Sequence, residues 1–326
     1  MQTMRAAVLH EFGPPEALVL EERPDPVPGE GQALVQVETS GVTFVETQVR
    51  AGNGTIPAHR PPLPVVLGNG VGGMVVTVGE NVDPSWLGAR VVTALGGNGG
   101  YAELAVADVT ELIRVPEPLG IAEATALLSD GRTALGLVRA AQPQPGEWAL
   151  VEAAAGGVGG LLVQLLHDAG ARVIGAAGSS AKREKAVALG AEAALDYTAA
   201  DWTRHVLDST GGAGVDLAFD GIGGRIGQQA VTVLRDDGRI ATYGMAAGTL
   251  TELDETAHER GIHTIGFGTP PAPETPYQLA TDAIDLAAQG RLHPTIGQTF
   301  PLDDAADAHA AIEARATTGK TLLLPG

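Results

Sequence analysis

Residues 148–185 combine an apolar strand pattern, a glycine-rich turn, a helix pattern and a second strand pattern, in that order. Ala154, Gly156 and Gly159 occupy the three small-residue positions of a G-x-G-x-x-G fingerprint. A middle position without a side chain lets the backbone approach a pyrophosphate, and the N–H groups and positive dipole end of the following helix favour that anion. The order of the elements therefore predicts a dinucleotide site in a parallel strand-helix-strand unit.

The end of the second strand indicates which dinucleotide such a site takes. An NAD site usually places an acidic residue about 20 residues after the glycines to bind the ribose 2′-hydroxyl, but residues 175–178 read Gly-Ala-Ala-Gly. Ser179, Ser180, Lys182 and Arg183 follow, and hydroxyls with a cation suit a 2′-phosphate. We therefore predict NADPH. The alternative is that the basic residues form the solvated start of an ordinary helix.

Composition and charge exclude several classes of protein. The chain has 326 residues, 44% of them hydrophobic, with 45 glycines and 21 prolines, which is typical of a folded protein of two domains with many turns. Its formal net charge of −19 argues against binding to nucleic acid or to anionic membranes. The N-terminus lacks the apolar core of a signal peptide, so we expect a cytoplasmic location.

The cysteine and histidine content argues against a metal site. The chain contains no cysteine, so it lacks the thiolates that commonly hold catalytic and structural zinc in dehydrogenases. Its eight histidines form no His-x-x-His or His-Glu-x-x-His pair. We therefore expect no bound metal, and we expect each histidine to lie on the surface or to serve packing.

The apolar patterns divide the chain into regions of different texture. Residues 4–123 contain short strand-like runs between turn residues, which predicts a β-barrel. In residues 124–265 strands alternate with helical stretches, as in a doubly wound parallel sheet. Residues 277–288 have helical spacing, and the chain ends in a strand-like TLLLP. The predicted class is α/β, with a parallel nucleotide-binding sheet and a separate β-barrel.

Eight segments of the chain are similar to the zinc-independent medium-chain dehydrogenases/reductases, in particular to quinone oxidoreductases and enoyl reductases. They lie at 41–52, 65–82, 88–92, 99–104, 130–136, 152–160, 214–224 and 236–245. The resemblance implies a GroES-like catalytic domain from residues 1–123 and 268–326, and a Rossmann NADPH-binding domain from residues 124–267. It also implies a homodimer and hydride transfer from NADPH to a small-molecule quinone or an activated α,β-unsaturated carbonyl, without zinc.

The resemblance further implies which residues contact the cofactor. Those expected at the pyrophosphate are Ala155, Gly156, Gly157, Val158 and Gly159. Those expected around the adenosine 2′-phosphate are Gly178, Ser179, Lys182, Tyr197 and Arg315. Those expected along the nicotinamide half are Phe44, Tyr243, Gly244, Met245 and Phe267. The alternative for Tyr243 and Phe267 is a place in the core, and Asp220 is expected to be a turn or ribose-side residue.

Thr43, Thr133 and Asn69 are the predicted catalytic residues. The resemblance places the two threonines beside the nicotinamide ring and its ribose, and without a metal the developing enolate or hydroquinone charge must be met by such donors, by the cofactor ribose or by water. The family commonly has Asn in place of Thr43, Asp in place of Glu46 and Glu in place of Gly70. The lining of the pocket is therefore changed, and solvent is the expected proton source.

Three other functions stay open. Some enoyl reductases carry a proton-donating tyrosine that has no equivalent at residues 53–59, which weakens the enoyl-thioester alternative. A zinc-free alcohol or aldehyde reductase would need a stronger acid than the predicted pocket contains. A non-catalytic NADPH-binding sensor or structural protein would keep the cofactor site without turnover.

Overall fold

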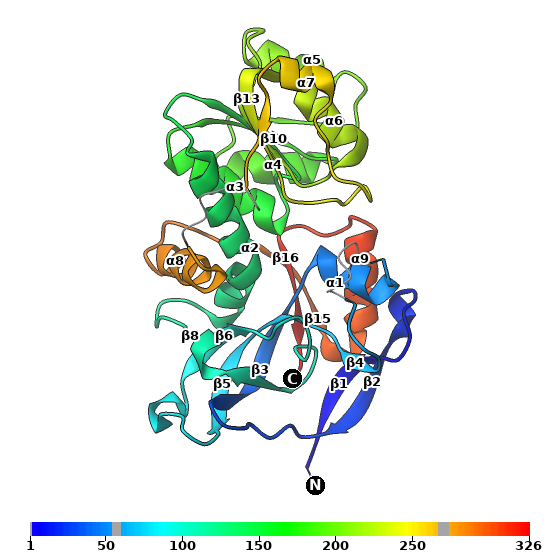
Figure 1. Ribbon diagram of the computed structural model, residues 1–326, viewed down its shortest axis with the longest axis vertical. Coiled ribbons are helices and arrows are strands. Elements are labelled where there is room, and N and C mark those ends of the chain that lie inside the picture. The colour runs from blue at the N-terminus through cyan, green and yellow to red at the C-terminus, as the bar shows by residue number, and fades with distance from the viewer. Residues whose placement is uncertain (1, 54–59, 267–273) are drawn as a thin grey trace. The chain divides into compact units, whose positions relative to one another are not determined.

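The computed structural model describes residues 2–53, 60–266 and 274–326, and the chain divides into two compact units (Figure 1). Unit 1 contains Met1–Ser129 and Ala280–Gly326, so both chain ends belong to it. Unit 2 contains Asp130–Leu279. The long helix α2 (Ile121–Ala141) and helix α8 (Pro276–Ala288) each contribute residues to both units.

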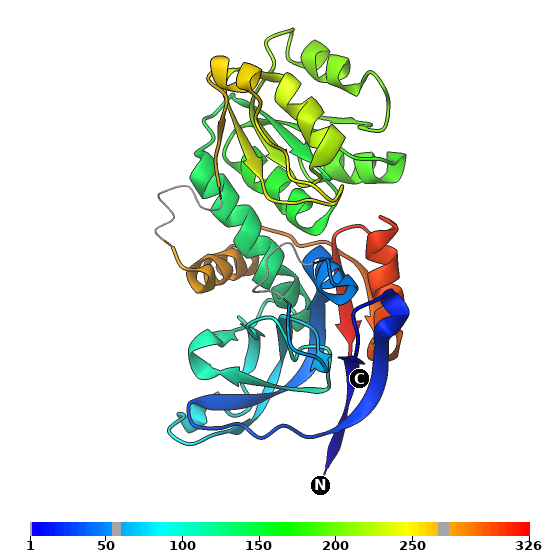
Figure 2. The same cartoon turned by 45° about the vertical axis from the view of Figure 1, so that its right-hand side comes forward.

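Unit 1 is built mainly from two β-sheets. The smaller sheet has the order β2-β1-β4, with β1 at Thr3–Leu9, β2 at Leu18–Pro24 and β4 at Val65–Val66, and its β1–β2 pair is the blue antiparallel ribbon in Figure 2. The larger sheet has the order β15-β16-β3-β5-β6-β8, and β7 also pairs with β3. Its strands are β3 (Gln32–Val42), β5 (Gly70–Val78), β6 (Arg90–Ala94), β7 (Leu104–Asp108), β8 (Ile113–Arg114), β15 (Ile296–Pro301) and β16 (Lys320–Leu324).

Two helices of unit 1, α1 and α9, lie near the predicted catalytic residues of that unit. Helix α1 (Phe44–Ala51) follows β3 directly and ends at Gly52, whose φ of 77° favours glycine. Helix α9 (Ala305–Glu313) contacts α1 and strands β15 and β16. The buried Arg50 of α1 forms an ion pair with Glu313 of α9, so the two helices are tied by charge as well as by packing.

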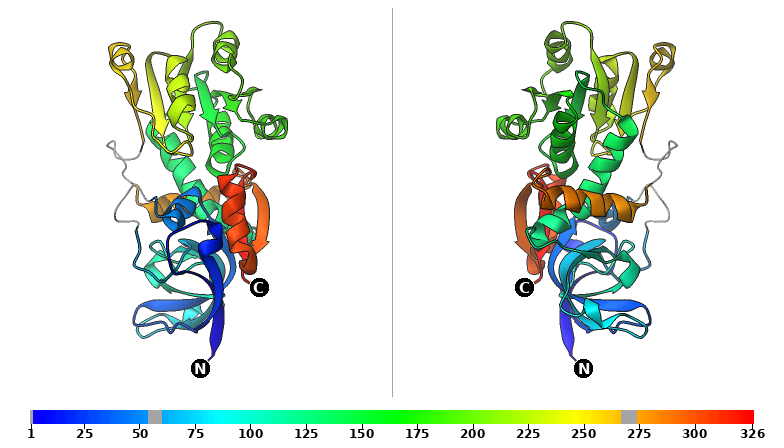
Figure 3. Two further views of the ribbon diagram at one scale, coloured as in Figure 1. Left: turned by 90° about the vertical axis from the view of Figure 1, so that its right-hand side faces the viewer. Right: turned by 90° about the vertical axis from the view of Figure 1, so that its left-hand side faces the viewer.

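Unit 2 contains one parallel sheet of six strands with helices on both faces (Figure 3). The strand order is β11-β10-β9-β12-β13-β14. From β9 the chain adds β10 and β11 on one side, and then adds β12, β13 and β14 on the other side, so the switch point lies between β9 and β12. The strands are β9 (Trp148–Glu152), β10 (Arg172–Ala176), β11 (Ala193–Leu195), β12 (Val215–Asp220), β13 (Leu234–Thr242) and β14 (His263–Thr264). In such sheets ligands bind at the carboxyl ends of the strands beside this switch point.

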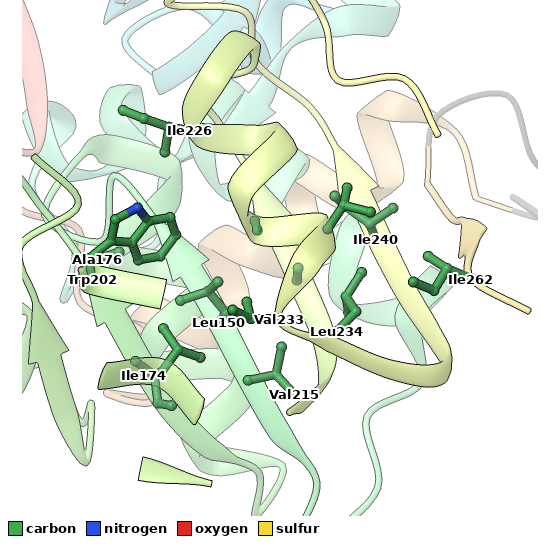
Figure 4. Close-up of a cluster of buried hydrophobic side chains, with 14 of the residues drawn as sticks. Leu150, Ile174, Ala176, Trp202, Val215, Ile226, Val233, Leu234, Ile240 and Ile262 are labelled. Carbon is green, nitrogen blue, oxygen red and sulfur yellow. The ribbon is translucent and has the colours of Figure 1, made fainter. Parts of the chain in front are cut away.

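The helices of unit 2 are α3 (Gly157–Asp168), α4 (Ser180–Ala188), α5 (Trp202–Ser209), α6 (Gly224–Thr232) and α7 (Glu255–Glu259). Three of them, α5, α6 and α7, bury a large apolar cluster against this sheet (Figure 4). Trp202 is fully buried in the cluster together with Leu150 and Ile174. Truncation of such a tryptophan to alanine costs about 3–5 kcal/mol, so this contact holds α5 firmly on the sheet.

The structure confirms the predicted α/β class and most predicted elements. Strands β1, β2, β3, β5, β6 and β7 lie in the region of residues 4–123, where the sequence contains short strand-like runs. The sequence did not predict α1, because this helix is short, begins directly after a strand and lies among strand-like segments. Within the described residues, no helix combines the length and the apolar character that crossing a membrane requires.

Candidate functional site

The predicted glycine turn connects β9 to α3 in unit 2, as the sequence indicates. Gly156 is the N-cap of α3 and has no side chain to cap the helix itself. A Cβ atom at Gly159 would lie 2.3 Å from the backbone oxygen of Ala153, so this position must be glycine for the helix to pack on the turn. The first turn of α3 therefore starts at the carboxyl end of a central strand, where its N–H groups and dipole suit a pyrophosphate.

The residues predicted around a 2′-phosphate gather at the start of α4. Ser179 is exposed and is the N-cap of α4, where its Oγ accepts a hydrogen bond from the Lys182 N–H over 3.4 Å. A Cβ atom at Gly178 would lie 3.4 Å from the Tyr197 hydroxyl, so Tyr197 lies beside the same turn. The structure thus brings Gly178, Ser179, Lys182 and Tyr197 together, and no carboxylate stands at residues 175–178.

Arg183 and Arg315 are two further basic residues that bear on the predicted phosphate site. The basic residues do lie in an ordinary helix, α4, as the alternative proposed, and Arg183 forms an ion pair with Asp196 at 2.8 Å between Nη1 and Oδ2. This pair ties α4 to the segment after β11, so Arg183 is not a free phosphate ligand. Arg315 is exposed at the end of α9 in unit 1, with a φ of 55°, and its N–H donates to the Ile312 carbonyl.

Tyr243, Gly244 and Met245 follow β13, at the same edge of the sheet as the glycine turn. The N–H groups of Tyr243 and Gly244 both donate to the Asp220 carbonyl, over 2.9 and 3.3 Å. A Cβ atom at Gly244 would lie 2.3 Å from the Gly221 oxygen, so this backbone passes very close to the end of β12. Burial raises the pKa of the Tyr243 hydroxyl, which stays protonated. Phe267 lies outside the described residues.

Two buried carboxyl groups at this edge were not predicted as a pair. Glu152 ends β9 and Asp220 ends the neighbouring β12, and both residues are fully buried. Asp220 Oδ1 accepts hydrogen bonds from the N–H groups of Ile222 and Gly223, at 2.9 and 2.7 Å, which gives Asp220 the turn role expected of it. Among the described residues, Asp220 Oδ2 accepts no hydrogen bond from an N–H group or from the hydroxyl of a Ser, Thr or Tyr.

A buried pair of this kind favours a shared proton. Burial and the charge of Asp220 raise the pKa of Glu152 well above its usual range. A protonated Glu152 donates to Asp220, whereas two carboxylates would repel each other in a buried setting. The sequence could have indicated this pair, because residues 152 and 220 both stand at the end of a predicted strand, and neighbouring parallel strands end at the same edge of a sheet.

In unit 1, Thr43 and Asn69 lie on either side of the buried carboxylate of Glu46. Thr43 is the N-cap of α1 and forms a capping box with Glu46: its N–H and its hydroxyl donate to Glu46 Oε2 over 2.6 and 3.1 Å. The Asn69 N–H donates to Glu46 Oε1 over 2.7 Å. The Thr43 hydroxyl thus gives its only hydrogen to Glu46. In the sequence, the T-x-x-E spacing of residues 43–46 indicates this capping box.

The side chain of Asn69 keeps a donor available. Its Oδ1 accepts a hydrogen bond from the Gly97 N–H over 2.7 Å, which fixes the orientation of the amide. The side chain is half-buried, and no hydrogen bond from its Nδ2 to another described residue is found. Phe44, the first residue of α1, is half-buried beside Thr43. Thr133 is half-buried on the unit 2 part of α2, where its hydroxyl likewise bonds to no other described residue.

A second buried polar group lies behind Glu46. The hydroxyl of the fully buried Tyr101 donates to Glu46 Oε2 over 3.3 Å and lies 3.0 Å from His309 Nε2. Burial and the nearby Arg50 lower the pKa of His309 to about 3, so this histidine is neutral. His309 therefore serves a buried hydrogen-bonded network, which its sequence position did not indicate. Within the described part of the chain, no three His, Asp or Glu side chains form a group suited to a metal ion.

Comparison with known proteins places the chain in a family. The model of the alcohol dehydrogenase GroES-like domain matches residues 29–117, and that of the zinc-binding dehydrogenase matches residues 189–323. A 2-haloacrylate reductase from Burkholderia sp. is 34% identical over 98% of this chain and 98% of its own length. A probable quinone oxidoreductase from Schizosaccharomyces pombe is 33% identical over 96% of this chain and 94% of its own.

Solved structures agree with this placement over nearly the whole chain. An Escherichia coli quinone oxidoreductase complexed with NADPH has a TM-score of 0.88 at 28% identity, covering 99% of this chain and 100% of that one. An NAD-dependent alcohol dehydrogenase has the same TM-score and coverage at 30% identity. The predicted family and fold are confirmed, and the chain belongs to the medium-chain dehydrogenase/reductase family.

Proposed function

We propose that this protein is an NADPH-dependent oxidoreductase that reduces a quinone or an activated α,β-unsaturated carbonyl without zinc. The observation that carries the cofactor choice is the turn at Gly178 and Ser179, where an exposed serine and Lys182 stand in place of a carboxylate. Such a turn suits a 2′-phosphate and offers nothing to bind a free 2′-hydroxyl bidentately. The NADPH complex of the Escherichia coli relative supports the same choice.

The residues of unit 2 fit a dinucleotide. Gly156 and the first turn of α3 would hold the pyrophosphate, because no side chain covers these N–H groups at the N-cap. Ser179, Lys182 and Tyr197 would hold the adenosine phosphate. The backbone at Tyr243 and Gly244 would line the nicotinamide half. Bound NADPH supplies the hydride, and the protein's own task is to orient it and to keep water away.

In unit 1, Asn69 is the best-supported donor for the acceptor's oxygen. Its amide is held at Oδ1 by Gly97 and at the backbone by Glu46, so its Nδ2 hydrogens are oriented before any substrate arrives. Oriented donors of this kind stabilise the charge that develops on an enolate or hydroquinone oxygen. The Thr43 hydroxyl is a weaker candidate because it is already bonded to Glu46. Thr133 stays a candidate for the same role.

The absence of cysteine from the whole chain supports a mechanism without zinc. Quinones and activated alkenes suit such a site, because they accept hydride readily and their reduced forms take a proton from water. Two relatives, a 2-haloacrylate reductase and a probable quinone oxidoreductase, have names that fall in these two substrate classes. The expected homodimer and cytoplasmic location remain predictions.

One alternative has an observation in its favour. The solved NAD-dependent alcohol dehydrogenase matches this fold as well as the quinone oxidoreductase does. A zinc-free alcohol or aldehyde reductase, however, needs an acid close to the carbonyl oxygen, and the buried acids Glu46 and Glu152 are enclosed in networks of their own. We therefore rank this activity second.

A panel of acceptors tests the proposal. Oxidation of NADPH is followed at saturating cofactor with a benzoquinone, a 2-haloacrylate, a simple enone, an enoyl thioester and an aldehyde. We expect turnover with the first three and little with the aldehyde. Turnover with the aldehyde alone would favour the second activity, and tight NADPH binding without turnover of any acceptor would favour a non-catalytic protein.

A further inference from the structure

The carboxylate of Glu46 links two chain segments that both carry predicted pocket residues. Its Oε2 accepts hydrogen bonds from the Thr43 N–H and hydroxyl at the start of α1. Its Oε1 accepts the Asn69 N–H, 2.7 Å away, from the turn between β4 and β5. One side chain thus sets the spacing between residues 43 and 69, which are 26 positions apart in the sequence.

Helix capping alone does not account for this arrangement. A capping box needs only the bonds between the N-cap and N3 residues, which engage Oε2. Here Glu46 is only 5% exposed, and Oε1 is used entirely for a second segment. Burial of a carboxylate is costly unless hydrogen-bond donors surround it. The several donors around Glu46 therefore offset the cost of its burial and hold it in place.

The surroundings of Glu46 also fix its position from behind. Tyr101 donates to Oε2, and the ring of Tyr101 meets that of His309 edge-on, with centroids 5.6 Å apart. The buried Lys320 of β16 contributes a favourable charge, although burial still raises the pKa of Glu46. Four donors and one cation, from four separate chain segments, therefore surround the carboxylate.

We propose that Glu46 is a positioning residue, which holds Thr43 and Asn69 at the spacing that the reduction of the acceptor requires. This inference rests on the proposed function, because it assigns Glu46 a role through the Asn69 donor. Glu46 itself does not touch the substrate. Its carboxylate fixes the Asn69 backbone, and the Gly97 N–H fixes the Asn69 side chain, so loss of Glu46 frees one of the two points that orient the Asn69 amide.

Amide hydrogen exchange tests the geometry without any need for activity. In Glu46→Gln, the amide group replaces one oxygen by a donor, which must face either the Thr43 or the Asn69 N–H. Loss of a hydrogen bond to a charged group corresponds to about a tenfold to hundredfold change, so exchange in peptides covering residues 40–46 or 66–70 should accelerate by that factor. Glu46→Asp keeps the charge but shortens the reach, and should free Asn69 more than Thr43.

The control is Glu38→Gln, which removes an exposed carboxylate from β3 and should leave exchange in both peptides unchanged. Peptides covering 172–176 in unit 2 report whether a variant is folded. If Glu46→Gln fails to fold, Glu46→Asp carries the test. Unchanged exchange in both peptides of a folded Glu46→Gln, or unchanged exchange at residues 66–70 of a folded Glu46→Asp, would overturn the proposal.

Kinetics then separate positioning from general stability. Glu46→Gln should lower kcat with the best acceptor by about tenfold, while KM for NADPH changes less than about twofold. In a Thr43→Val background the additional effect of Glu46→Gln should shrink, because the two residues act as one unit. Equal effects in both backgrounds, or a loss of NADPH affinity alone, would overturn the positioning role. If the wild-type enzyme turns over no acceptor, the proposed function fails, and the exchange measurement still decides whether Glu46 holds the two segments.

Discussion

Replacing Glu152 with glutamine should remove a pH dependence from the stability of unit 2. Glutamine has the shape of a protonated glutamate, and its amide can still donate to Asp220, so Glu152→Gln should change the free energy of unfolding by less than about 1 kcal/mol at pH 5. The wild-type protein differs from the variant only in that its Glu152 can lose the proton. Burial and the charge of Asp220 raise the pKa of Glu152 in the folded state.

The sign and size of the effect follow from this raised pKa. Above the ordinary glutamate pKa the unfolded chain has released the proton while the folded chain still holds it, so the stability of the wild type falls as pH rises, until the raised pKa is passed. The slope for one proton is about 1.4 kcal/mol per pH unit. Between pH 5 and pH 7 the variant should therefore gain up to about 2.7 kcal/mol over the wild type.

Urea denaturation of the cofactor-free protein at several pH values measures this difference. Tryptophan fluorescence reports mainly on unit 2, because two of the three tryptophans, Trp148 and the fully buried Trp202, lie there. Glu184→Gln, which removes an exposed carboxylate from α4 in the same unit, is the matched control and should keep the wild-type pH dependence. Parallel curves for wild type and Glu152→Gln between pH 5 and pH 8 would refute the shared proton.

Three further predictions concern the site. Lys182→Ala should weaken NADPH binding by about tenfold to a hundredfold and leave NADH binding nearly unchanged. The control Lys185→Ala, on the same helix, should change the affinity for neither cofactor. Equal losses of affinity for both cofactors in a fluorescence titration of Lys182→Ala would contradict the phosphate assignment. Asn69→Asp keeps the acceptor for the Gly97 N–H but loses the Nδ2 donor, so kcat should fall by about tenfold or more, with the exposed Asn98→Asp as control. Dialysis against a strong chelator should leave turnover intact, and its loss together with stoichiometric zinc by elemental analysis would show that the metal-free mechanism is wrong.

The dinucleotide site was predictable because its signals are local. The glycine turn, the helix after it and the missing carboxylate at residues 175–178 all lie within one short stretch of chain, and the periodicity of the flanking strands fixes where they fall. Arg183 shows the limit of such reasoning. Its charge suits a phosphate, but its partner Asp196 could be assigned only once β11 had been placed beside β10.

The buried polar networks were not predictable, because their members are far apart in the sequence. Tyr101 and His309 are separated by 208 positions, and no composition or spacing rule connects them. Thr43 was predicted as a free hydroxyl donor from the resemblance, whereas the structure engages it with Glu46. Which hydrogen bonds a pocket side chain already makes depends on tertiary contacts, and these decide how much of its donor capacity remains.

The most direct test of the account compares kcat/KM for NADPH and for NADH with the wild-type enzyme and its best quinone or enone acceptor. One charge-assisted contact to the 2′-phosphate corresponds to about a tenfold to hundredfold preference, so kcat/KM should favour NADPH by at least that factor. Lys182→Ala should remove most of the preference. Equal values for the two cofactors, or a preference for NADH, would contradict the central claim that the Ser179 and Lys182 turn reads the phosphate of NADPH.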